Sequence, residues 1–391
     1  MRYLLFDDEN RANLLPLAYT RPVAEFRVGI LTINEKWSRR MPKEIVFGGY
    51  VTEPYLQDKY PSVIKEDQLW INASVCPNDA LIKDILSLEM NESLFDEQEH
   101  IIAFRSGNFK DSVDCQKSYT DVAFTHVQNL WDIFSKNAIE LEADFELITQ
   151  GRASQKANAT NNILGEENLF IEEGAVLNCA IINASNGPVY IGKDAEVMEG
   201  SIIRGPFALC EASQTKLGTK IYGPTTVGPY SKVGGELNNV VIFGYSNKGH
   251  DGFLGNSVLG EWCNIGADSN ISNLKNNYAE VRLWNYAAGR FSHTGLQFCG
   301  LVMADHSKCG INTMFNTGTV VGVSANIFGT GFPRNFIPSF SWGGPQGQST
   351  FMIPKAFEVS EKVMARRNVV FDENDRKILT KVFDLSKDFR R

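Results

Sequence analysis

The 391-residue sequence lacks several features that would assign it to a specialised class. It has no window of about eighteen uncharged apolar residues, the length that an α-helix needs to span a bilayer. Its N-terminal MRYLLFDDENR has a run of four apolar residues followed by three acids, so we expect a short strand there and no secretory signal. Seven cysteines, an odd number without a CxxC pair, disfavour a disulfide scaffold or structural zinc site and indicate a reduced, cytoplasmic setting.

An excess of positive charge is also absent. The 46 acidic residues outnumber the 38 basic residues, which gives a formal net charge of -8. This balance argues against a nucleic acid or an anionic membrane as the partner.

Glycine is scarce in the first part of the chain. Only four of the 33 glycines precede residue 151, and the other 29 lie between Gly151 and Gly347. Charge divides as well, because residues 1–150 hold 15 basic and 25 acidic side chains whereas residues 355–391 hold 10 and 7. We therefore expect three segments: an α/β domain over 1–150, a glycine-rich domain over 151–354 and a helical tail over 355–391.

The middle segment repeats with a period of six residues. Mostly apolar side chains recur at every sixth position in three series. These are Ile191, Val197, Ile203, Leu209, Thr215, Ile221, Val227 and Val233; then Val241, Phe253, Leu259, Ile265 and Ile271; then Met303, Cys309, Phe315, Val321 and Ile327. The pattern predicts a parallel β-helix in which three six-residue sides form a coil of about eighteen residues. Leucine-rich repeats need a longer period of roughly 20–29 residues, which is not found.

The six-residue period breaks twice, near residues 238–247 and between Asn273 and Met303. Loops that leave a regular solenoid often carry binding or catalytic groups, so these two breaks are the places to search for a site. The first break leads into the stretch SNKGHDGFLGNSVLGEWCNIGADSNISNLK, residues 246–275.

This stretch resembles the acetyltransferase domain of the bifunctional glucosamine-1-phosphate N-acetyltransferase/N-acetylglucosamine-1-phosphate uridylyltransferase family. The matching positions are Lys248-Gly249-His250, Phe253, Asn264-Ile265-Gly266-Ala267 and Asn273. The resemblance implies a left-handed parallel β-helix, acetyl-CoA as the acetyl donor and assembly as a homotrimer. The run from Asn273 to Lys275, together with residues 300–322, is similar to the archaeal sugar-1-phosphate nucleotidylyltransferase/acetyltransferases.

The resemblance also implies roles for individual residues. His250 becomes the general base that removes a proton from the attacking amine, and an unperturbed histidine pKa of about 6.5 suits that task. Asn264 and Asn273 become groups that orient the substrate, although an asparagine at a coil corner is an equally good interpretation of Asn264. Phe253 stands where the family usually has tyrosine.

Cations near the breaks are candidates to bind the phosphate of a sugar phosphate. These cations are Lys232, Lys248, Lys275 and Arg282, each of which taken singly is equally consistent with a solvated surface charge. The resemblance places coenzyme A near Ala267 and Gly310.

The N-terminal segment carries a second resemblance. Residues 11–29, RANLLPLAYTRPVAEFRVG, are similar to the signature of sugar-1-phosphate nucleotidyltransferases, with Arg11 and Arg21 at its basic positions. The family's glycine-rich phosphate loop is replaced here by residues 7–10, DDEN, and these carboxylates would repel a triphosphate unless Mg²⁺ intervened. Two interpretations stay open: an active nucleotidyltransferase that uses UTP, and a degenerate domain that packs and organises oligomers.

The leading functional hypothesis is an enzyme of sugar-nucleotide synthesis. It would transfer acetyl from acetyl-CoA to the amine of an amino-sugar phosphate, above all glucosamine 1-phosphate, with uridylyl transfer to UDP-N-acetylglucosamine as a second step. One alternative is a nucleotidyltransferase, for example of the glucose-1-phosphate thymidylyltransferase type, with an inactive acyltransferase domain. The other alternative is a non-catalytic oligomerising scaffold.

Overall fold

The computed structural model describes residues 1–109 and 114–390, which form two compact units. The first unit comprises residues 1–14, 20–26 and 31–129, and the second comprises residues 15–19, 27–30 and 130–391. The segment boundaries expected from composition stay a prediction, but the structure groups residues 130–149 with the second unit.

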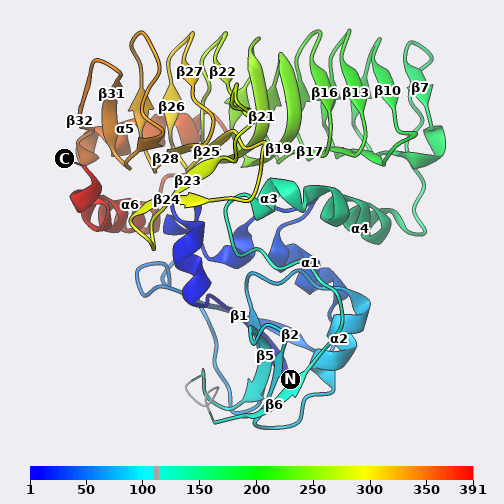
Figure 1. The fold of residues 1–391 in the computed structure, drawn as a ribbon. Coiled ribbons are helices and arrows are strands. Elements are labelled where there is room, and N and C mark those ends of the chain that lie inside the picture. The colour runs from blue at the N-terminus through cyan, green and yellow to red at the C-terminus, as the bar shows by residue number, and fades with distance from the viewer. Residues whose placement is uncertain (110–113, 391) are drawn as a thin grey trace. The chain divides into compact units, whose positions relative to one another are not determined.

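The first unit is an α/β fold around one six-stranded sheet (Figure 1). The sheet order is β2-β1-β3-β5-β4-β6; the β2, β1 and β3 strands are parallel, and β5 runs antiparallel to its two neighbours. The strands are β1 (Arg2–Phe6), β2 (Val46–Val51), β3 (Gln68–Asn72), β4 (Glu92–Phe95), β5 (Ile101–Ser106) and β6 (Gln116–Tyr119), with helices α1 (Ile33–Arg40) and α2 (Asp79–Leu86). The expected short strand at the N-terminus is therefore confirmed as β1.

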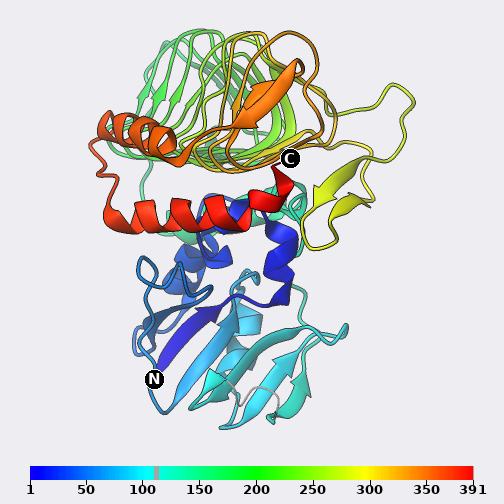
Figure 2. The same cartoon turned by 90° about the vertical axis from the view of Figure 1, so that its left-hand side faces the viewer.

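The second unit is a parallel β-helix of about ten coils, as the six-residue period predicted. Its early coils each place three short strands in three columns, and Figure 2 looks along this stack. The first column contains β7 (Asn162–Leu164), β10 (Ile181–Asn183), β13 (Ile202–Arg204) and β16 (Lys220–Tyr222); the second contains β8 (Leu169–Ile171), β11 (Val189–Ile191), β14 (Phe207–Leu209) and β17 (Thr225–Val227); the third contains β9 (Val176–Leu177), β12 (Glu196–Val197), β15 (Gln214–Thr215), β18 (Lys232–Val233) and β20 (Asn247–Lys248).

Two longer strands continue both of the first two columns. These are β19 (Glu236–Gly244) and β21 (Phe253–Glu261). The later coils add β25 (Leu301–Met303), β28 (Thr319–Val321) and β30 (Phe336–Ile337); β22 (Asn270–Ile271) and β27 (Met314–Phe315); and β26 (Lys308–Cys309), β29 (Asn326–Ile327), β31 (Ser341–Gly344) and β32 (Gly347–Thr350). An antiparallel hairpin, β23 (Arg282–Asn285) and β24 (Arg290–His293), projects from the second break in the period.

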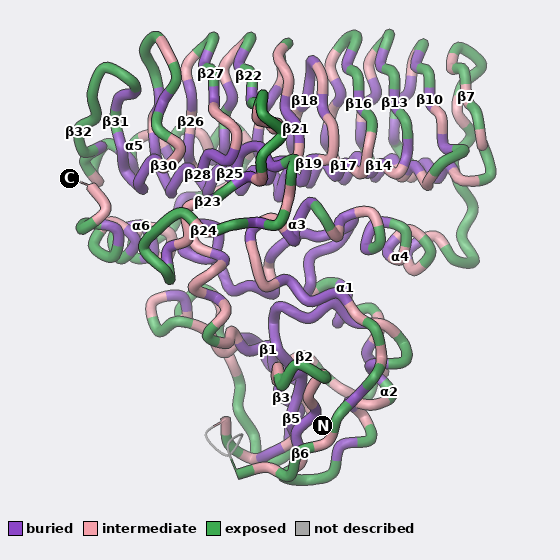
Figure 3. The backbone as a smooth tube through the Cα atoms, viewed as in Figure 1, coloured by how far each residue is buried: buried purple, intermediate pink, exposed green. Residues whose placement is uncertain are grey.

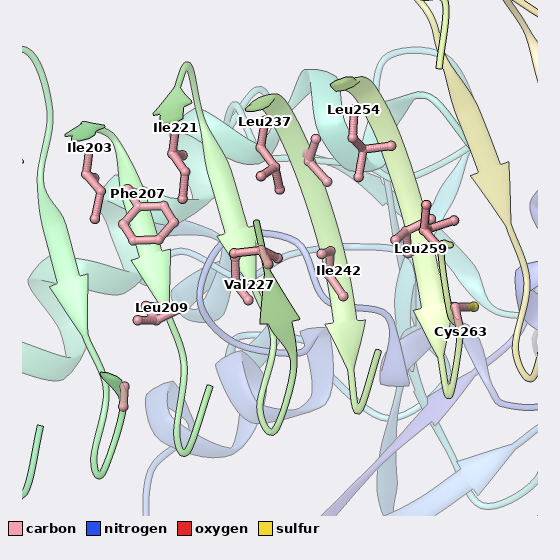
Figure 4. Close-up of a cluster of buried hydrophobic side chains, with 14 of the residues drawn as sticks. Ile203, Phe207, Leu209, Ile221, Val227, Leu237, Ile242, Leu254, Leu259 and Cys263 are labelled. Carbon is pink, nitrogen blue, oxygen red and sulfur yellow. The ribbon is translucent and has the colours of Figure 1, made fainter. Parts of the chain in front are cut away.

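The interior of the β-helix is one stack of buried side chains, and Figure 4 shows part of it. The first and third predicted series lie inside it, but the second series is shifted at two places: Ile242 and Leu254 belong to the stack instead of Val241 and Phe253. The cause is the length of two corners, because the single left-handed residues Asn239 (φ 57°) and Asn256 (φ 45°) replace the longer corner of the preceding coil at Gly223-Pro224. The coil is shortened, and the period loses its phase.

Two adjacent isoleucines of β13 allow a matched test of this packing. Ile203 is fully buried in the stack, whereas its neighbour Ile202 is 44% exposed. We expect Ile203→Ala to lower the free energy of unfolding by about 2–5 kcal/mol, because it leaves a cavity between coils. Ile202→Ala should change it by about 0.5 kcal/mol or less. Urea unfolding followed by circular dichroism measures both, and equal losses would contradict the assignment of the inward face.

Helices cover parts of the β-helix within the second unit. The strands of the second column are almost entirely buried (Figure 3), because α3 (Asp132–Ser135) and α4 (Asn137–Thr149) pack against β17, β19 and β21. The buried Asn137 fixes this packing, since its side-chain amide nitrogen donates to Thr226 Oγ1 at 3.2 Å.

The predicted helical tail is present as α5 (Ile353–Ala365) and α6 (Glu373–Leu385). Asp372 begins α6 with a reciprocal capping box to Asp375. Among the described residues, no helix is both long enough and apolar enough to cross a membrane.

Candidate functional site

A pocket of about 700 Å³ opens on the third column of the β-helix. It is lined by residues from five successive coils, from α5 and from the two residues that follow α5. The lining residues are Lys216, Lys232, Tyr245, Asn247, Gly249, His250, Trp262, Cys263, Asn264, Ile265, Gly266, Ala267, Lys308, Ile311, Val363, Arg366 and Arg367. Four residues singled out from the sequence therefore share one cavity: Lys232, His250, Asn264 and Ala267.

Positive charge dominates this pocket. Five of its lining residues are cations, namely Lys216, Lys232, Lys308, Arg366 and Arg367, and none of the lining residues is acidic. Burial lowers the pKa of Lys232, and the nearby charges of Arg367, Lys216 and Arg366 lower it further. Cations held this close to one another, in a cavity whose lining residues include no carboxylate, favour a polyanionic ligand that would relieve their mutual repulsion.

Two of these cations were missed by sequence reasoning on the acyl site: Lys216 and Lys308. The period does contain a signal for Lys232 and Lys308, since each lies one residue before an inward side chain, Val233 or Cys309. Strand pairing then brings them into one ladder, in which Lys232 pairs with Asn247, Asn247 with Asn264 and Asn264 with Lys308. The six-residue period identifies the inward residues, but it does not show which of the outward residues beside them lie in the same cavity.

His250 lies exposed at the corner that follows β20. Lys248 fixes the backbone of this corner. Its side chain is 1% exposed, and its Nζ donates hydrogen bonds to the carbonyl oxygens of His250 (2.5 Å) and Asp251 (3.1 Å). Burial lowers the pKa of Lys248 to about 8. Lys248 is not among the residues that line the pocket, so its position suits support of the His250 corner better than contact with a sugar phosphate.

Close backbone packing shapes the floor beside Asn264. A Cβ on Gly266 would lie 2.3 Å from the carbonyl oxygen of Gly310, so only glycine fits between these coils. Ala267 accepts a backbone hydrogen bond from Asn312 at 2.8 Å, and Gly310 donates to Ile327 at 2.8 Å. The predicted coenzyme positions Ala267 and Gly310 thus lie on adjacent coils, although only Ala267 lines the pocket.

Phe253 and Asn273 form a separate group around Gly255. A Cβ on Gly255 would lie 2.6 Å from the Phe253 ring and 2.7 Å from Asn273 Nδ2. Asn273 Nδ2 donates to Asn256 Oδ1 at 2.8 Å, and the Phe253 amide donates to Asn270 Oδ1 at 3.0 Å. Neither Phe253 nor Asn273 lines the 700 Å³ pocket.

The remaining predicted cations lie on the insertion at the second break. Lys275 Nζ donates to the carbonyl oxygen of Glu280 at 2.6 Å. Arg282 is exposed on β23, opposite His293 of β24. These two cations are therefore separate from the cationic pocket, and Lys275 serves to hold the insertion.

An aromatic column borders the pocket. Tyr230, Tyr245, Trp262 and His306 occupy equivalent left-handed corners of successive coils, with φ between 53° and 63°. Their rings stack, with centroids 4.3 Å apart for Tyr245 and Trp262. Tyr245 and Trp262 also line the cavity, so they give it one apolar wall. These rings are missed by a six-residue apolar pattern, because they point outward at corners.

In the first unit, the carboxylates of the acidic loop at residues 7–10 accept hydrogen bonds from neighbouring residues of the same unit. Asp7 accepts hydrogen bonds from the Val23 amide at 2.9 Å and from Thr52 Oγ1 at 2.5 Å. Burial raises the pKa of Asp7 to about 6. Asp8 accepts from Asn10 and from Asn72 Nδ2 at 2.9 Å. These contacts make the loop a structural turn.

The two basic residues of the nucleotidyltransferase signature are buried. Arg11 is 8% exposed, with Nε 3.2 Å from Asp7 Oδ2 and a side-chain nitrogen donating to Tyr55 at 3.2 Å. Arg21 is 6% exposed and lies near Glu25. Burial raises the pKa of Glu25, and the positive charge of Arg21 opposes that rise. Both arginines are thus engaged with carboxylates of their own unit.

Comparison with known proteins finds a sequence relative of part of the chain. The chain is 31% identical over 144 residues to a bifunctional sugar-1-phosphate nucleotidylyltransferase/acetyltransferase of Sulfurisphaera tokodaii, a match that covers 36% of this chain and 35% of that protein. The chain therefore matches about a third of the length of this relative. A UDP-N-acetylglucosamine acyltransferase structure from Campylobacter jejuni aligns with 60% of this chain and 83% of its own, at 15% identity and a TM-score of 0.28.

The family model named sugar nucleotidyl transferase matches residues 3–153. That range includes the signature at residues 11–29, the loop at residues 7–10 and the whole sheet of the first unit. Residues 3–153 thus match the model of the sugar nucleotidyl transferase family, in line with the resemblance predicted from the sequence.

Proposed function

We propose that this chain is an acetyl-CoA-dependent N-acetyltransferase of sugar-nucleotide synthesis, acting on an amino-sugar phosphate such as glucosamine 1-phosphate. The observation that carries the proposal is the cavity in which His250 meets five cations and an aromatic wall. A polyanion with an aromatic base, such as the nucleotide part of coenzyme A, matches both properties of this cavity. The family of residues 3–153 supports a sugar phosphate as the acceptor.

His250 is proposed as the general base. The acceptor amine attacks the thioester carbonyl carbon, a C–N bond forms, and an imidazole nitrogen of His250 takes the proton that the amine loses. The tetrahedral intermediate then breaks its C–S bond, and the proton passes from the imidazolium to the leaving thiolate. The exposed position of His250 leaves its ring accessible to an acceptor, and Lys248 holds the corner that carries it.

The cations of the cavity are proposed to bind the donor phosphates. Arg366, Arg367 and Lys232 supply charge at the mouth formed by α5 and β18, and Lys308 supplies it from the adjacent coil. We assign Phe253, Asn273, Lys275 and Arg282 to the acceptor side, because the sequence resemblance gives them substrate-binding roles and none of them lines the cavity.

The titration of Lys308 predicts a pH dependence for donor binding. Burial lowers the pKa of Lys308 to about 8, so the ammonium that attracts a phosphate loses its proton as the pH rises above 8. Affinity for adenosine 3′,5′-bisphosphate should therefore fall about tenfold between pH 7.5 and 9.5. Calorimetric titration measures this, and Lys308→Gln should bind more weakly with a flatter profile. An equally steep fall in Lys308→Gln would assign the titration to another group.

A nucleotidyl-transfer step in the first unit has weaker support. The oxygens of Asp7 and Asp8 already accept hydrogen bonds from Val23, Thr52, Asn10 and Asn72. A Mg²⁺ ion does not fit this loop without breaking those contacts, so no step is derived through the metal. Uridylyl transfer with UTP stays the secondary proposal for this unit, on the strength of its family alone.

Two assays test the proposed function. Acetyl transfer is followed as release of free thiol from acetyl-CoA with glucosamine 1-phosphate, beside a panel of other amino sugars and their phosphates. Pyrophosphate release from UTP and N-acetylglucosamine 1-phosphate is followed separately. Absence of acetyl transfer over the whole panel would favour a nucleotidyltransferase or a non-catalytic scaffold, depending on the second assay. Light scattering tests the expected homotrimer.

A further inference from the structure

A cluster of two imidazoles and a carboxylate lies in the first unit and includes no residue of the acidic loop at residues 7–10. Asp96 and His100 lie in the turn between β4 and β5, and His126 lies on the segment that bridges to Val75. One candidate ligand atom from each of Asp96, His100 and His126 lies within 4.8 Å of the other two. The proposed acetyl transfer and the family signature use none of these side chains.

The turn between β4 and β5 fixes two of the three donors. Asp96 Oδ1 accepts the backbone amides of Gln98 (2.9 Å) and His100 (2.8 Å), and its Oδ2 lies 2.9 Å from His100 Nδ1. Burial alone would raise the pKa of Asp96, but the hydrogen bonds from His100 outweigh it and lower the pKa. The carboxylate is thus ionised at neutral pH and aimed at the imidazole.

The third donor, His126, is oriented by a hydrogen bond to its Nε2. His126 is 8% exposed, and its Nε2 lies 2.9 Å from Ser74 Oγ, which donates to Asn72 Oδ1 at 2.6 Å. Its ring meets the ring of His100 edge-on, with centroids 5.4 Å apart and an interplanar angle of 87°. In metal-binding histidines, a hydrogen bond to one ring nitrogen orients the other nitrogen toward the metal.

Gln128 completes the surroundings of His100. Its Nε2 lies 3.1 Å from His100 Nε2. A glutamine amide has both an acceptor and donors, so this contact can persist whichever nitrogen of the ring carries the proton. The ring of His100 is therefore held from two sides, by Asp96 and by Gln128.

We propose that Asp96, His100 and His126 bind one divalent transition-metal ion of the Zn²⁺ type. Ligand bonds of about 2.0–2.2 Å place neighbouring donors roughly 3.3 Å apart, so small side-chain rotations close this cluster onto an ion. The ion would take the place of the hydrogen bond between Asp96 Oδ2 and His100 Nδ1. Two imidazoles suit Zn²⁺, Co²⁺ or Ni²⁺, whereas Mg²⁺ prefers oxygen ligands.

The test uses the full chain and the metal alone. Equilibrium dialysis with Zn²⁺ should give one bound ion per chain, and Co²⁺ should give the visible absorption of a low-coordinate site. Asp96→Asn keeps an oxygen for the turn amides but removes the charge, and His100→Gln removes a ligand; each should weaken binding at least about tenfold. His293→Ala is the matched control, because it removes a histidine–carboxylate pair outside the cluster, His293 with Glu280 at 3.0 Å.

A measurement on the unaltered chain tests the proposal even if the variants fail to fold. Paramagnetic Co²⁺ should broaden the ring resonances of His100 and His126 before those of the other three histidines. The proposal is overturned if Zn²⁺ affinity is the same in the Asp96→Asn and His100→Gln variants, if His293→Ala removes the binding, or if Mg²⁺ at equal concentration displaces Zn²⁺. None of these outcomes depends on acetyl transfer, so they are independent of the proposed function.

Discussion

His250→Ala is expected to lower kcat for acetyl transfer by about 10²–10⁴-fold, the usual contribution of a positioned general base. The affinity for acetyl-CoA should change little, because the five cations of the cavity remain in place. Thiol-release kinetics over a range of pH measure the effect. The rate of the variant should also depend on pH differently from the rate of the unaltered chain.

The control for this experiment is His293→Ala, which removes an exposed histidine from the hairpin β23–β24. It should retain most of the acetyl-transfer rate. A His250→Ala variant with full activity and an unchanged pH profile would remove His250 from the mechanism. Since His250 is exposed and its ring is not part of the core, a general loss of folding is not the expected result.

Charge reversal at Arg367 is expected to weaken binding of acetyl-CoA by about 10–100-fold. A hydrogen bond to a charged group contributes about 1.5–3 kcal/mol, and every 1.4 kcal/mol corresponds to tenfold in affinity. Arg367 is partly buried at the end of α5, where its Nη2 donates to Asn247 Oδ1 at 3.3 Å. Burial and the neighbouring Arg366 both lower its pKa, so the pocket concentrates charge at this position.

Calorimetric titration of coenzyme A into Arg367→Glu measures the loss. Lys193→Glu is the matched control, because it changes the net charge by the same amount at an exposed corner of the same β-helix that does not line the cavity. The loss in Arg367→Glu should also shrink at high salt, since the attraction to phosphates is screened. Equal losses in both variants would indicate a non-local effect of net charge.

The β-helix could be predicted from the sequence because its period repeats a simple rule. A side chain such as Ile203 or Val321 points inward because its position in the six-residue unit always faces the interior of the coil. The rule fails where a corner changes length, as at Asn239, because a loss of residues there moves every later inward position. The strand pairing between Ile242 and Leu259 then follows the backbone rather than the phase of the earlier coils.

The candidate site was only partly accessible from the sequence. The resemblance at residues 246–275 indicated His250 and Asn264, but the cavity around them also needs Lys216 from an earlier coil and Lys308 from a later one. Such neighbours are set by lateral strand pairing across an insertion, which the order of residues does not show. Arg366 and Arg367 reach the cavity through the fold of the tail after the last coil, which no periodicity describes.

The insertion at the second break can vary in length without disturbing the strand ladder of the β-helix. The strand β21 pairs directly with β25, and β22 pairs with β27, so the ladder continues as if residues 272–300 were absent. The extra residues leave and re-enter at neighbouring points, and the entropic cost of a closed loop grows only slowly with its length. The hairpin β23–β24 can therefore be lengthened, shortened or exchanged as a module while the stack of coils keeps its register.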